Sequence, residues 1–178
     1  RLAVPRGETA VTDQKDDPAF RYFPTNYRWS MGLLLCLSAA PWGGAEIDEV
    51  NRVGLALKDK VGDDKAWLEE WAKMGDKVEA RGREEEQKGH KLTAAAYLMR
   101  ASQYYQTGER FLQHGPNSAA IYKKAVKSFA DAARMINRPK IESVEVPYGD
   151  KTLPALFVHA APEVAGNKPA PAMVFFDE

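Results

Sequence analysis

Cysteine is almost absent from this chain of 178 residues. The single cysteine, Cys36, cannot form a disulfide within the chain and cannot supply the cysteine pair of a metal site. This composition favours a reducing, cytoplasmic location. Because Cys36 lies in an apolar segment and burial raises the pKa of a thiol, we expect it to be buried, reduced and inert.

An excess of charge of either sign is also missing. Lys and Arg total 25 and Asp and Glu total 25, so the formal net charge is zero. No overall field attracts nucleic acid or acidic lipid, and we expect neither nucleic acid nor a membrane as a partner. The three histidines, His90, His114 and His159, stand far apart in the sequence, so neither a metal site nor any other cofactor is expected.

Long apolar runs are lacking as well, and none would cross a bilayer. Residues 28–40 (RWSMGLLLCLSAA) imitate a signal sequence, with a charged start, an apolar centre and small residues at the end. Because the segment is short and follows an aromatic-rich stretch, a buried helix is the preferred interpretation. Residues 1–18 have few large apolar groups and no period, so we expect a disordered leader.

Apolar residues return every three or four positions through most of the chain, which predicts a helical domain over residues 19–138. Glycines, prolines and a capping residue at Asp63 or Asp64 mark the ends of its segments. The last two helices carry more aromatic surface than a short bundle needs to cover, which predicts a homodimer through this domain. The expected helices cover residues 29–40, 45–60, 65–87, 93–113 and about 117–136.

The period changes to two after Pro139. Residues 141–147 and 153–160 predict a β-hairpin around the turn at Gly149 and Asp150. Residues 172–176 (AMVFF) form an unbroken apolar run, which is typical of a third strand covered on both faces. The predicted fold class is therefore mainly α with a β tail, in which residues 139–178 are the first three strands of an incomplete α/β domain.

A dense group of aromatic and cationic side chains precedes the first helix and continues into it. Two interpretations are open: the group is a hydrophobic clamp that anchors the helical domain, which we favour, or it is one wall of a pocket for a substrate. The consecutive carboxylates Glu84, Glu85 and Glu86 would point in different directions on a helix and do not suit acid–base catalysis. The aromatic and cationic group consists of Tyr22, Phe23, Tyr27, Arg28 and Trp29.

Three ordered blocks of sequence resemble a branch of the α/β-hydrolase superfamily: FRYFPTNYRWSMGLLLCLSAAPWGGAEIDEV, TAAAYLMRASQYYQTGERFL, and VEVPYGDKTLPALFVHA with PAMVFFDE. This branch includes the 2,6-dihydroxypseudooxynicotine hydrolase of nicotine breakdown and the fungal hydrolase that shortens polyketide chains in melanin synthesis. The resemblance implies a helical N-terminal cap over a Ser-His-Asp core. It also implies cleavage of a C–C or ester bond next to a carbonyl in a small aromatic or carbonyl substrate, often by a dimer.

The sequence departs from that family at the centre of the chemistry. The G-x-S-x-G turn that exposes a nucleophilic serine does not occur, so we expect the catalytic serine, acid and histidine to be absent and this chain alone to be inactive. Asp177 and Glu178 stand where the oxyanion loop would follow the third strand, with Glu178 in place of an expected glycine. The alternative is a noncatalytic helical interaction or dimerisation module.

Overall fold

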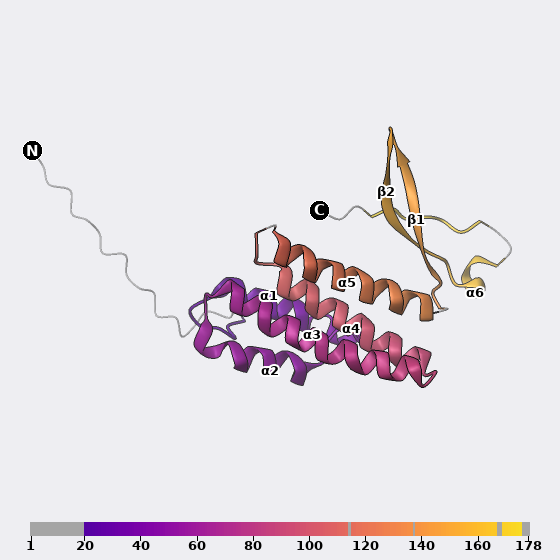
Figure 1. The fold of residues 1–178 in the computed structure, drawn as a ribbon. Coiled ribbons are helices and arrows are strands. Elements are labelled where there is room, and N and C mark those ends of the chain that lie inside the picture. Colours follow the sequence, from indigo (N-terminus) through magenta and orange to yellow (C-terminus); the bar gives the residue numbers. More distant parts are fainter. Residues whose placement is uncertain (1–19, 114, 137, 167–168, 176–178) are drawn as a thin grey trace, which may run out of the picture.

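A computed structural model of the chain describes residues 20–113, 115–136, 138–166 and 169–175. Helices α1 to α5 lie side by side, and a β-hairpin rises from the C-terminal end of α5, which is on the outside of the bundle (Figure 1). The expected leader over residues 1–18 lies outside the described residues. The helices are α1 (Tyr27–Leu37), α2 (Ile47–Leu57), α3 (Asp64–Gln87), α4 (Lys91–Glu109) and α5 (Pro116–Met135).

Side-chain caps determine where two of the helices begin. The Asn26 carboxamide accepts a hydrogen bond from the backbone N–H of Trp29 at the start of α1 (3.0 Å). Asp63 caps α3 in the same way, accepting from Lys65 N–H (3.0 Å) and Ala66 N–H (3.1 Å), as the sequence predicted. These bonds satisfy backbone donors that have no partner within their own helix.

The first helix ends earlier than predicted. It stops at Leu37, and the chain then makes a 3-10 turn, η2 (Ala40–Trp42), that contains the proline expected to end the helix. Gly43 follows with a φ of 77°, a left-handed conformation that glycine adopts without strain. The second helix is followed by another 3-10 turn, η3 (Lys58–Lys60).

The core of the bundle is built from aromatic side chains that cross between helices. Helix α4 packs against α3 on one side and α5 on the other. Small residues let the helices approach closely: a Cβ added to Gly75 of α3 would lie only 2.5 Å from Cε1 of Tyr105 on α4. Cys36 is fully buried in the same core, as predicted. The largest fully buried side chains are Trp29, Trp67, Trp71, Tyr104 and Tyr105.

The β-hairpin is confirmed, with strands β1 (Ile141–Tyr148) and β2 (Lys151–Val158). The strands are antiparallel, and Tyr148 faces Lys151 across a turn in which Gly149 has a φ of 61°. Both faces of the hairpin carry exposed apolar side chains, including Val146 and Leu153 on one face and Leu156 on the other. A short helix, α6 (Pro162–Ala165), follows.

The predicted third strand is not formed. Residues 172–175 have no regular secondary structure, and Phe176 lies outside the described residues. A strand requires a neighbour that pairs with its backbone N–H and C=O groups, and within the described ranges no strand pairs with this segment. Its apolar sequence alone is therefore not enough to make it a strand. The division at residue 138 into two domains stays a prediction.

None of the helices that the structure describes is both long and apolar enough to cross a membrane.

Candidate functional site

The aromatic group at the start of α1 is divided between the core and the surface. Phe23 and Trp29 are buried and pack edge to face at 5.4 Å between ring centroids. Trp67 of α3 joins them, 5.0 Å from the Trp29 ring. Ser30 closes the turn before the helix, since its Oγ accepts from Phe23 N–H (2.9 Å) and donates to the Phe23 carbonyl (3.1 Å). Phe23 and Trp29 therefore anchor the segment that precedes α1.

Arg28 binds across the bundle. One of its terminal nitrogens lies 2.7 Å from each carboxylate oxygen of Asp64, the first residue of α3, and its guanidinium lies 4.6 Å from the centroid of the Phe111 ring. Trp29 donates its indole N–H to the same Asp64 carboxylate (2.9 Å). The Asp64 carboxylate thus holds both Arg28 and Trp29 against α3.

Tyr22 and Tyr27 behave differently from each other. The Tyr22 ring covers Gly54 of α2, and its hydroxyl donates to the side-chain carbonyl of Asn51 (2.7 Å). Tyr27 is exposed over 66% of its surface and does not enter the core. The contacts of the other four residues match those of a clamp. Contact of the group with a substrate stays a prediction.

A groove of about 470 Å³ lies between α5 and the root of the hairpin. Two alanines of α5 line it, together with residues of both strands. Among the described residues that line it, Arg134 and Glu142 are charged. Its lining residues are Ala130, Ala133 and Arg134 from α5 and Ile141, Glu142, Ser143, Val144 and Leu156 from the hairpin.

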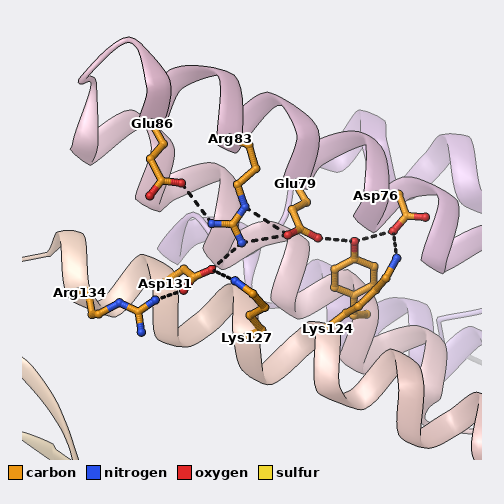
Figure 2. Close-up of polar contacts among 9 residues, drawn as sticks. Asp76, Glu79, Arg83, Glu86, Lys124, Lys127, Asp131 and Arg134 are labelled. Carbon is orange, nitrogen blue, oxygen red and sulfur yellow. Dashed lines mark hydrogen bonds and ion pairs between the residues drawn. The ribbon is translucent and has the colours of Figure 1, made fainter.

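A polar network connects α3 with α5 (Figure 2). Sequence reasoning did not detect it, although a signal was present: the participating residues follow the spacing three, four, three on both helices, which places each set on one helical face. Tyr105 of α4 joins them through its hydroxyl. The members are Asp76, Glu79, Arg83 and Glu86 on α3 and Lys124, Lys127, Asp131 and Arg134 on α5.

Asp131 is at the centre of the network and is only 5% exposed. It accepts hydrogen bonds from Arg83 and from Lys127, both at 2.6 Å, and also from Arg134. Burial by itself would raise the pKa of the Asp131 carboxyl, but the hydrogen bonds from Lys127 and Arg83 outweigh burial and hold that pKa below its usual value. Asp131 is therefore ionised at neutral pH and compensated by three cations.

Tyr105 lies at the other end of the network. Its hydroxyl lies 2.6 Å from Asp76 Oδ1 and 2.9 Å from Glu79 Oε2, and Lys124 donates to the same Asp76 oxygen (2.6 Å). Burial, and then the two carboxylates, raise the pKa of Tyr105 well above its usual range. The phenol stays protonated at neutral pH and cannot act as a base. The network is thus suited to holding helices together rather than to acid–base chemistry.

The remaining candidate groups do not converge on one point. His90 lies 2.6 Å from Glu85, and His159 lies 2.8 Å from Glu142 on the hairpin, whereas His114 lies outside the described residues. In the part of the chain that the structure describes, no three His, Cys, Asp or Glu side chains could together hold a metal ion. Glu85 and Glu86 point to different partners, Lys88 and Arg83, as expected for consecutive carboxylates on a helix.

Related sequences occur in fungi. Hydrolase LUC6 from a Fusarium species is 32% identical over 153 residues, which are 83% of this chain and 36% of that protein. The α/β hydrolase psoB from Aspergillus fumigatus is 29% identical over 143 residues (76% of this chain, 32% of that protein), and the α/β hydrolase ucsC from an Acremonium species is 25% identical over 141 residues (74% and 28%). No family model matches the chain.

The chain is a relative of the fungal α/β hydrolases. It spans about a third of the length of these relatives. For an α/β hydrolase, the residues named from the sequence as the oxyanion region are Asp177 and Glu178, and both lie outside the described residues. The geometry of that region therefore stays a prediction.

Proposed function

We propose that this chain is the N-terminal helical cap and the opening strands of a serine-type α/β hydrolase. The observation that carries the proposal is the similarity to proteins named α/β hydrolase over about three quarters of the chain. The order of elements, five helices followed by an antiparallel hairpin, is in keeping with it. The reaction proposed for the complete enzyme is cleavage of a C–C or ester bond next to a carbonyl in a small aromatic or carbonyl substrate.

The chain contributes to that enzyme without performing the chemistry. The serine, acid and histidine of the triad would come from the rest of the protein, because no G-x-S-x-G sequence occurs here. We assign the Phe23–Trp29 segment to anchoring the cap, and Tyr27 is its most exposed aromatic group for contact with a substrate. The proposed enzyme acts in the cytoplasm, needs no cofactor and forms a homodimer through its helical region.

A noncatalytic interaction module is the second candidate, and one observation favours it. Large apolar side chains remain exposed on α5 and on the hairpin, which is typical of a surface that another chain covers. The clearest cases are Tyr122, Val126, Leu153, Leu156 and Phe157.

The two candidates are separated by expressing this chain beside the longer reading frame that contains it. We expect the longer protein to hydrolyse an aryl ester, and we expect no turnover above background from the 178-residue chain. Triad-deleted hydrolases retain a rate enhancement of about 10³ only when the oxyanion hole and the bound substrate are intact. Serine-dependent turnover by the short chain would refute the proposal, and a reading frame without a serine elbow would favour the interaction module.

A further inference from the structure

We draw no further inference here: the strongest candidate, the apolar surface that the β-hairpin exposes around the groove at the end of α5, carries none, because nothing in the structure shows what covers it.

Discussion

Gly75 is one of the residues on which the close contact of α3 and α4 depends. Replacing it by Ala adds about 1 kcal/mol of helix propensity. The new Cβ, however, would lie 2.5 Å from Cε1 of Tyr105, whose hydroxyl is held by Asp76 and Glu79. Since overpacking of this kind costs about 1–3 kcal/mol, we expect Gly75→Ala to lower the free energy of unfolding by roughly 1 kcal/mol in urea denaturation.

Gly82 on the same helix provides the control. A Cβ at this position would lie 3.1 Å from Leu98 Cδ2, Leu98 Cγ and Tyr97 Cβ, so these neighbours need to move by only a few tenths of an ångström. Gly82→Ala should therefore cost less stability than Gly75→Ala. A stabilised Gly75→Ala variant would show that Tyr105 is not held in place as described.

Asp131 makes the stability of the bundle depend on pH. The pKa of Asp131 in the folded state lies below its pKa in the unfolded chain, which is about 4. The contribution of Asp131 to the free energy of unfolding is therefore fully present above about pH 4 and is lost as the pH falls through the folded-state pKa. We expect Asp131→Asn to lower the free energy of unfolding by about 2 kcal/mol at pH 7, since a charged hydrogen-bond acceptor is removed. The difference from the unmodified chain should shrink toward pH 3.

The comparison for Asp131 is Asp48, which pairs with Arg52 on the surface of α2 and keeps 70% of its side chain exposed. Exposed pairs of this kind contribute less than about 1 kcal/mol. Asp48→Asn should therefore have little effect at either pH. Equal losses for the two variants, measured by urea unfolding at pH 7 and pH 3, would contradict the central role of Asp131.

At the scale of the element, α5 contains two buried serines in different situations. Ser118 donates to Glu109 Oε1 (2.9 Å), whereas the Ser128 hydroxyl has no hydrogen-bond partner among the described residues. An unpaired buried hydroxyl costs about 1–3 kcal/mol of desolvation. We expect Ser128→Ala to raise the free energy of unfolding by about 1 kcal/mol and Ser118→Ala to lower it by a similar amount.

Thermal unfolding of Ser128→Ala and Ser118→Ala, each compared with the unmodified chain, tests this prediction. If both variants lose stability equally, the Ser128 hydroxyl has a partner in solution.

At the scale of the whole molecule, burial changes the expectation for self-association. Among the aromatic residues that predicted a homodimer, Tyr104 and Tyr105 are fully buried inside the bundle. Tyr122 is the exposed exception on α5. The homodimer stays a prediction, and sedimentation of the 178-residue chain at tens of micromolar, the range of weak association, tests it. A monomer at every concentration would contradict it.

Several features of the molecule followed from the sequence alone because they are local. The helices were predictable since large apolar residues recur at the helical period, and the cap at Asp63 lies next to the N–H groups that it binds. The hairpin was predictable from its period of two and from the turn at Gly149 and Asp150. The resemblance to α/β hydrolases likewise depended only on the order of sequence blocks, and the comparisons confirmed it.

Other features were decided only by the tertiary structure, because they depend on which elements are neighbours. Asp131 lies 48 positions from Arg83, and the two could be linked only after α3 and α5 had packed on the same helix, α4. The exposed face of α5 could not be read from its composition, because small residues fill the space against α4 and leave Tyr122 and Val126 outside. The apolar segment at residues 172–175 is not a strand, because a strand exists only where another backbone pairs with it.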